Sequence, residues 1–437
     1  MNWLNFFQPK YDLKHTFGRG INANISEDEE RLFTEAYEAF EKREILNAYE
    51  LFFESLINFN GEEPNENITY KKDDEKLEFT IYQGSAKVTG TITNEHLYAQ
   101  AIITKKRNAD VALKRYILER NYQFTYSCYF SDDEYIMLKL YHDNITMSPQ
   151  KAFYPLRELA LNADFDKEHI KSEFSDVILE DMSHIQKMDE SELKIKYDAL
   201  HKWIDELENK VLTLPSNDNA SMQAFLYLNL LFKVDYLLVP KCRFYQKMSK
   251  TILEYFSEES MSIESKNEEL KRYVESLKEI SFEDFSLNFY TAKYTFNPTE
   301  KTSHEEVINF ISESLAKIRW YKNNRYTQVI PTIYRYIAFY ALYNYGLYPV
   351  LRELLHTLVE IQNPEFFQAL DYSVLYDKES QTFSKRTIIS RVDDIIAPHQ
   401  EQFKSLESFS DELNFSSMNE FSNSFYLSLQ NLNFEEI

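Results

Sequence analysis

The spacing of hydrophobic residues changes once along this chain, and the change limits the possible folds more than any other feature. Within residues 33–56 apolar side chains recur every three or four positions, which is the period of a helix. Between Leu77 and Ile103 they alternate with polar residues, which is the period of a half-buried strand. Beyond about residue 185 we find no strand pattern. The sequence therefore predicts an α+β fold, with an antiparallel sheet near the N-terminus and an all-α domain after it.

The first predicted domain has the order α-β-β-β-α-β-β-α over about residues 26–175. Its first helix is expected to begin at Ser26, because Ser26 and Glu29 have the spacing of a capping box. Gly84 marks a turn between two strands. The elements expected after the first helix are strands at 77–82, 86–92 and 97–103, a helix at 109–120, strands at 122–130 and 134–141, and a helix from 148.

Helical patterns separated by prolines fill the second predicted domain. The candidates are residues 191–212, 219–239, 242–256, 266–278, 304–320, 332–344 and 349–361. Because no fixed repeat period is present, we expect a helical bundle or an irregular helical repeat. The predicted organisation is an N-terminal arm at 1–25, an α+β domain at 26–180 and a helical domain at 185–437.

The end of the chain is acidic and rich in Phe, with no Lys or Arg after Lys404. Met418, Phe421, Phe425 and Leu429 fit one face of a helix, so we favour a packed helix over an acidic-aromatic tail.

Composition narrows the function classes. The 437 residues include 48 Lys and Arg against 71 Asp and Glu, so the net charge is −23. Nucleic acids and anionic membranes repel such a chain, and we expect neither as a partner. No apolar stretch reaches the ~18 residues of a membrane span, and the N-terminus lacks a basic region before an apolar run. We expect a cytoplasmic protein without a disulfide framework, because there are only two cysteines.

Short matches in the central segment resemble a known family. The matching residues are Arg115-Tyr116-Ile117-Leu118-Glu119-Arg120-Asn121-Tyr122, Tyr126, Phe130, Asp132-Asp133, Leu138-Lys139-Leu140, Ser148-Pro149, Leu156-Arg157-Glu158-Leu159-Ala160 and Ala163-Asp164. This run is similar to bacterial YbjN-like proteins, which share the fold of CesT-type type III secretion chaperones. The resemblance covers about residues 26–175 and implies the same order of helices and strands. It also implies a non-enzymatic, often dimeric protein that holds partner segments in extended form. The long helical extension departs from a minimal chaperone and favours a regulatory or scaffolding role.

No residue pattern points to catalysis, to a metal or to a cofactor. The nine His include no pair at the spacing of a zinc helix, and the six Gly provide no phosphate-binding loop. We interpret Cys128 as a buried structural thiol on the apolar strand face, next to Tyr126 and Phe130. Cys242 lies between Lys241 and Arg243, which would favour its thiolate, although no His adjoins it.

The second face of the predicted sheet gives the main binding hypothesis. It is expected to carry aromatic and apolar residues where a solvated face would be charged: Tyr82, Tyr98, Ile102, Tyr129, Tyr135, Met137 and Tyr141. Such enrichment is typical of interface cores. Three alternatives remain for what packs on this face: the C-terminal helices of the same chain, a second copy of it, or a foreign protein or peptide.

A second aromatic cluster lies in the helical half. Tyr336 and Tyr340 share a helical stripe, and Arg319 and Arg325 are nearby in sequence. Core packing is the first interpretation. A groove for an extended acidic peptide, including the chain's own tail, is the alternative.

We therefore expect a non-enzymatic protein-binding module with a chaperone-like, scaffolding or regulatory role. The alternatives are an enzyme whose site lies in the cleft between the domains, and a purely structural helical scaffold.

Overall fold

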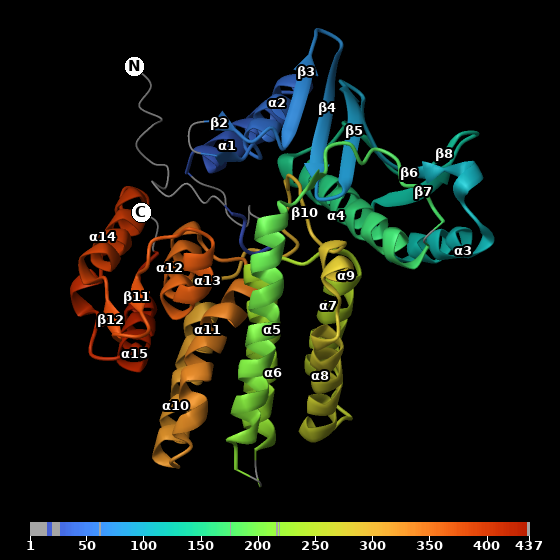
Figure 1. The fold of residues 1–437 in the computed structure, drawn as a ribbon. Helices are drawn as coiled ribbons and strands as arrows, with labels where there is room; N and C mark the ends of the chain where they lie inside the picture. The colour runs from blue at the N-terminus through green and yellow to red at the C-terminus, as the bar shows by residue number, and fades with distance from the viewer. Residues whose placement is uncertain are drawn as a thin grey trace.

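The computed structural model describes residues 15–19, 27–60, 63–174, 176–215, 217 and 219–434. Six antiparallel strands gather at one end of the molecule and a layer of helices fills the other end (Figure 1). The predicted α+β class is confirmed.

The sheet has the strand order β3-β4-β5-β6-β8-β7. Its strands are β3 (Ile68–Lys72), β4 (Lys76–Gln83), β5 (Ala86–Thr93), β6 (His96–Lys105), β7 (Ser127–Ser131) and β8 (Tyr135–Asp143). The predicted sheet lacked β3, because Ile68 is the only buried residue in this edge strand and no alternation is visible. The predicted turn at Gly84 is confirmed: its φ is +53°, and a Cβ there would collide with the Asp164 carboxylate.

One face of the sheet, the inner face, is covered by helices of the first domain. These helices are α1 (Glu27–Glu41), α2 (Ile45–Glu54), α3 (Val111–Arg120) and α4 (Pro149–Glu173). The long helix α4 packs against β4, β5, β6, β7 and β8, while its opposite side contacts α7 (Cys242–Ser257) of the second domain. Ser148 caps α4 by accepting a hydrogen bond from the amide of Lys151, as its sequence predicts. The inner face therefore looks toward the helical half, and the outer face looks away from it (Figure 1).

The second domain is helical, and all seven predicted helices are present. Besides α7, the helices are α5 (Glu190–Leu212), α6 (Ala220–Leu238), α8 (Ile263–Lys278), α9 (Phe282–Ser286), α10 (His304–Asn323), α11 (Ile330–Asn344), α12 (Pro349–Gln362), α13 (Pro364–Ala369), α14 (Lys385–Ile396) and α15 (Met418–Gln430). The predicted terminal helix is α15, which buries Phe421, Phe425 and Leu429 completely, so the alternative of a free tail is wrong for these residues.

The expectation that no strand follows residue 185 is wrong. Short antiparallel pairs join β9 (Gln186–Lys187) to β10 (Tyr290–Thr291) and β11 (Tyr376–Asp377) to β12 (Thr382–Phe383). A further pair, β1 (Phe59–Asn60) with β2 (Glu63–Pro64), lies in the first domain. Each strand has only two residues, which is too few to show an alternating pattern.

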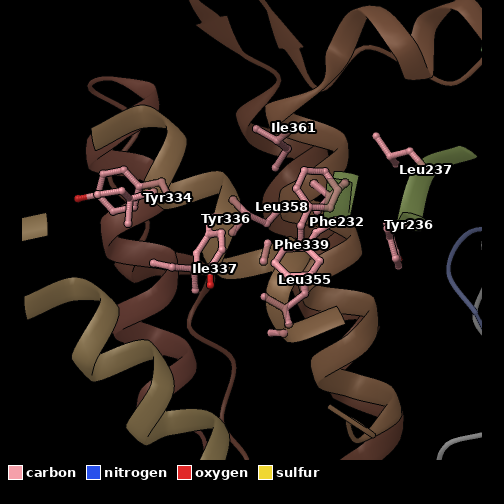
Figure 2. Packing of buried hydrophobic residues seen from close by; sticks show 14 of the residues in the cluster. Phe232, Tyr236, Leu237, Tyr334, Tyr336, Ile337, Phe339, Leu355, Leu358 and Ile361 are labelled. Carbon is pink, nitrogen blue, oxygen red and sulfur yellow. The ribbon is translucent and has the colours of Figure 1, made fainter. Parts of the chain in front are cut away.

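Two separate hydrophobic cores underlie the two halves. One is built from buried residues between positions 36 and 170, and the other from buried residues between 193 and 432. Figure 2 shows part of the second core, where Phe232 of α6, Phe339 of α11 and Leu355 of α12 lie among other fully buried side chains. Rings of α6 and α11 pack edge to face in this layer, since Phe225 and Tyr336 are 5.1 Å apart at an interplanar angle of 86°.

One residue of the second half belongs to the first core. Phe296 is 1% exposed and packs on Phe153 of α4 at 5.5 Å between ring centroids. It belongs to residues 290–300, which we call the strap. The fully engaged side chain of Gln83 accepts hydrogen bonds from the amides of Thr295 and Phe296 and donates one to the Phe296 carbonyl.

Polar contacts secure the strap along its length. Asn58 donates to the Tyr294 carbonyl at 2.7 Å. Arg157 of α4 donates to the carbonyls of Asn297 and Pro298 at 2.9 and 2.8 Å. Because these donors belong to the first domain, the strap is held as though it were part of that domain.

Residues 15–19 make the reverse crossing, from the N-terminal side into the helical half. Phe17 packs against Phe367 and His356, with ring centroids 5.2 and 5.1 Å apart. Arg19 forms an ion pair with the buried Asp235 of α6 and donates to the Pro240 carbonyl. Each half of the molecule thus contains a short segment from the other side of the chain.

Truncating the strap's anchor should destabilise the protein strongly. Phe296→Ala removes a buried aromatic ring and leaves a cavity, which costs about 3–5 kcal/mol. We expect the urea midpoint of unfolding, followed by circular dichroism, to fall accordingly. The matched control is Phe130→Ala, because Phe130 is 48% exposed and its truncation should change the midpoint little. Equal midpoints for the two variants would show that the strap does not support the first core.

Candidate functional site

The outer face of the sheet is divided into a polar half and an aromatic half. On β3, β4 and β5 the outward residues are mostly Thr and charged side chains: Thr69, Lys71, Lys76, Glu78, Thr80, Lys87, Thr89, Thr91 and Thr93. On β6, β8 and β7 they are Tyr98, Gln100, Ile102, Cys128, Phe130, Tyr135, Met137, Lys139 and Tyr141, which we call the aromatic face. The polar half is typical of a solvated antiparallel sheet, and the aromatic face is not.

Cross-strand contacts organise the aromatic face. Met137 of β8 lies directly between its partners Ile102 on β6 and Phe130 on β7. The ammonium group of Lys139 lies 4.1 Å from the Phe130 ring centroid and 5.5 Å from that of Tyr98. Such cation–π contacts fix the long Lys side chain flat against the sheet. The result is a largely apolar strip that carries Lys139 at its centre and Lys105 opposite Tyr135.

The edge of this strip near β5 carries hydrogen-bonding groups. Tyr141 is 62% exposed and its hydroxyl is 2.8 Å from Nδ1 of His96. The hydroxyl of Tyr98 donates to the Gln100 side chain at 2.5 Å. Both tyrosines therefore hold defined positions although no helix supports them.

No helix of the described residues packs on the aromatic face. The helices that contact the sheet do so from the inner face, and neither hydrophobic core includes Tyr98, Tyr135 or Tyr141. The first of the three alternatives from the sequence, packing of the C-terminal helices, is therefore absent within these ranges.

The structure places Tyr129 on the inner face of the sheet and not on the outer face, where the sequence analysis placed it. Its side chain is 8% exposed and belongs to the first core, and its hydroxyl donates a hydrogen bond to the Asp166 carboxylate at 2.7 Å. The same shift moves Phe130 to the outer face. It also overturns the interpretation of Cys128 as buried, because Cys128 is exposed.

The turn between β7 and β8 causes this error. It pairs Ser131 with Ile136, and the Asp132 carboxylate accepts hydrogen bonds from the amides of Glu134 and Tyr135. This register places Tyr129 opposite Leu138, on the core side. A slip of one residue exchanges the two faces of a strand, so the assumed alternation with Tyr126 gave the wrong side.

The other predicted residues are placed as follows. Tyr98, Ile102, Tyr135 and Tyr141 are brought together on the aromatic face, and Met137 joins them although it is only 3% exposed. Tyr82 is also on the outer face, but β5 separates it from the others, and the ring of His184 lies against it at 5.0 Å. Sequence reasoning missed Phe130 and Lys139, which correct pairing of β7 with β8 would have revealed.

The free edge of β7 is occupied by side chains. The Glu158 carboxylate accepts hydrogen bonds from the amides of Thr125, Tyr126 and Ser127, each at 2.9 Å. Asn121 accepts the amide of Tyr129 at 2.6 Å. Although burial opposes ionisation, these donors outweigh it and hold the pKa of Glu158 below its usual value. This edge offers few free donors for an added strand.

Ionisable groups also meet at the junction of the two halves. Glu168 of α4 accepts hydrogen bonds from the Tyr290 hydroxyl at 2.5 Å and the Cys242 amide at 3.0 Å. Asp164 accepts the amide and hydroxyl of Ser85, and burial together with nearby Glu168 raises its pKa. These contacts join the strap, α4 and α7, so they give the carboxylates a structural role.

The second aromatic cluster is split by the structure. Tyr336 is buried in the helical core, whereas Tyr340 is half-buried and stacks on Phe310 at 4.5 Å. Arg319 and Arg325 are exposed. The chain's own tail does not occupy this region, because α15 packs in the helical core and Phe434 stacks on Tyr348.

Among the described residues, no three His, Cys, Asp or Glu side chains are grouped closely enough to hold a metal ion. No helix in these ranges is long and apolar enough to cross a membrane. No protein-family model matches the chain, and no curated protein or solved structure is significantly similar to it.

The two thiols provide a test of which sheet face is open. In the native protein Cys128 should react with a disulfide reagent such as DTNB within minutes, because it is exposed. Cys242 should react only after denaturation, since burial, reinforced by Glu168, raises its pKa to about 12. Cys128→Ser should abolish the native reaction. A native protein with two protected thiols would contradict an open aromatic face.

The raised pKa of Asp164 at the junction of the two halves predicts that the stability of the protein depends on pH. A carboxyl whose folded pKa is raised stabilises the protein below its unfolded pKa of about 3.9, and this stability is lost as the pH rises through the folded value. Asp164→Asn stays neutral and retains an oxygen that can accept the Ser85 hydrogen bonds. Its Tm should equal that of the wild type near pH 3.5 and exceed it by about 2 °C near pH 8. A difference that does not change with pH would contradict the raised pKa.

Proposed function

We propose that the protein is a non-enzymatic, cytoplasmic protein-binding module whose partner docks on the aromatic face. The observation that carries the proposal is the contrast across one sheet. The polar half is suited to water, while the neighbouring half exposes Phe130 and Tyr141 with no helix of the described residues above them. Aromatic residues and Met are enriched where proteins bind one another.

The shape of this surface favours a macromolecule over a small ligand. Small-molecule sites are concave, whereas the aromatic face is spread over three neighbouring strands on one side of a six-stranded sheet. The two best-defined pockets among the described residues lie elsewhere, along α3 and between helices of the second domain. Cytoplasmic location is supported by the two cysteines, which are unpaired.

Docking on the face is better supported than strand addition at an edge. Side chains already accept the outward amides of Ser127 and Tyr129 on β7. At the opposite edge β3 is short and carries Lys71 and Lys72, and such charges discourage edge pairing. A partner of this protein therefore makes side-chain contacts with β6, β8 and β7 more than backbone hydrogen bonds.

The resemblance to YbjN-like proteins and secretion chaperones suggests the kind of role. The order of the main helices and strands in residues 26–175 agrees with what the resemblance implies, apart from the additional α2 and β3. A chaperone-like role in holding a partner segment, or a scaffolding or regulatory role, accounts for an open aromatic face on a chain with a large helical extension.

A paired variant tests the proposal. Phe130→Ser with Tyr141→Ser should lose the partner while remaining folded, because both side chains are about half-exposed or more. Truncating two hot-spot aromatics weakens binding by about 2 kcal/mol or more. Met137 is unsuitable for this purpose, since its burial would confuse binding with stability.

The measurement has two arms. Light scattering after size exclusion determines whether the protein is a dimer that the variant dissociates. Affinity capture identifies a foreign partner, and calorimetry with that purified partner measures the loss. Thr80→Ala with Thr89→Ala, on the polar half, is the control and should bind normally. A monomer whose captured proteins are identical for wild type and both variants would refute the proposal.

A further inference from the structure

An aromatic pocket opens between four helices of the second domain, α6, α7, α10 and α11. These helices belong to the helical layer on the other side of the molecule from the sheet (Figure 1). Its volume is about 370 Å³. Aromatic side chains from α6, α7, α10 and α11 form most of its wall: Phe225, Tyr255, Phe256, Trp320, Tyr321 and Tyr336. This volume lies in the lower part of the range of roughly 300–1,000 Å³ that small-molecule sites occupy.

Two of the rings in the pocket wall keep about half of their surface accessible to solvent. Trp320 is 55% exposed and Phe256 is 47% exposed. Tyr336 forms the inner wall, where its ring meets Phe225 edge to face at 5.1 Å. A flat ring entering this space would therefore find aromatic side chains on several sides, which is the arrangement that aromatic ligands favour.

Hydroxyl groups line the same space without partners. Among the described residues, none forms a hydrogen bond with the hydroxyls of Tyr255, Tyr321 or Tyr336. Burial raises the pKa of each hydroxyl, so all three are neutral donors at physiological pH. None of the three hydroxyls is a buried atom without a partner, so each reaches water, and a ligand oxygen would take the place of that water.

One charged side chain belongs to the lining, and it is a cation. Lys317 of α10 lies one helical turn before Trp320 and Tyr321, and within the described part of the chain it forms no ion pair. The chain has 71 acidic residues against 48 basic ones, yet the ten lining residues include no acid. The pocket thus combines an aromatic wall, hydroxyl donors and a free ammonium group.

We infer that this pocket binds a small aromatic carboxylate. The ring packs against Trp320 and the edge-to-face pair of Phe225 and Tyr336, and the carboxylate accepts hydrogen bonds from Lys317 and from a tyrosine hydroxyl. Such charge-assisted bonds are about twice as strong as neutral ones, so the acid binds better than an uncharged analogue of the same shape. Polyphosphates are poor candidates because one Lys cannot balance several charges.

This site is independent of the proposed docking surface. It lies on α6, α7, α10 and α11, whereas the aromatic face lies on β6, β8 and β7. Failure of either proposal leaves the other unaffected.

Calorimetry with naphthalene-2-carboxylate and its neutral isostere naphthalene-2-carboxamide tests the inference on the full chain. The wild type should bind the carboxylate at least about tenfold more tightly than the amide. Lys317→Met should reduce affinity for the carboxylate about tenfold and leave affinity for the amide within about twofold. Trp320→Ala should weaken both probes.

Two controls separate binding from folding. Lys322→Met removes an exposed cation from the same helix outside the pocket and should bind both probes like the wild type. Tyr336→Phe keeps the ring and removes one donor, so it should weaken the carboxylate without lowering the Tm. The Tm of each variant is measured by circular dichroism.

Three results would overturn the inference. The first is no binding of either probe at millimolar concentration. The second is equal loss of both probes in Lys317→Met. The third is tighter binding of an acidic, Phe-containing peptide that competes with naphthalene-2-carboxylate, which would assign the pocket to a peptide anchor instead.

Discussion

The exchange of two short segments between the cores is the constraint on which the rest of the arrangement depends. Phe296 completes the first core from the second half of the chain, and Phe17 packs in the second core from the first half. Each crossing packs an aromatic ring against the core of the other half, and side chains such as Gln83 satisfy backbone groups of the strap, so a rotation of one half would break both sets of contacts. The exchange keeps α4 between the sheet and α7, and so directs the outer face of the sheet to solvent.

Two surfaces with different chemistry result from this arrangement. The aromatic face spreads over β6, β8 and β7 and carries Lys139 and Lys105, and it is the surface on which we propose that a macromolecular partner docks. The aromatic pocket is concave, carries a single cation at Lys317, and suits a small anion with a ring. In both places lysine gives a local positive charge on a chain whose net charge is −23.

The sequence predicted what repeats over short distances and missed what depends on distant contacts. The alternation from Leu77 to Ile103 predicted three strands because each buries every second residue on α4. Strand β3 lacks that signal since it buries only Ile68, and the register of β7 depends on the turn at Asp132. Phe296 sits in no periodic pattern, and its burial depends on Phe153, more than a hundred residues away. The aromatic face was predicted except for the one strand whose register was misjudged, while the pocket combines four helices whose relative placement no local pattern encodes.

The capped edge of β7 links the protein's solubility to acidity. Glu158 blocks this edge only while it is ionised, because a neutral carboxyl accepts the amides of Thr125, Tyr126 and Ser127 weakly. In strong acid the edge would lose this cap, while the 48 Lys and Arg would give the chain a net positive charge. An uncapped strand beside an exposed aromatic strip is a template for intermolecular β-pairing. The ionised Glu158 carboxylate therefore keeps the amides at this edge of the sheet paired and unavailable to another strand.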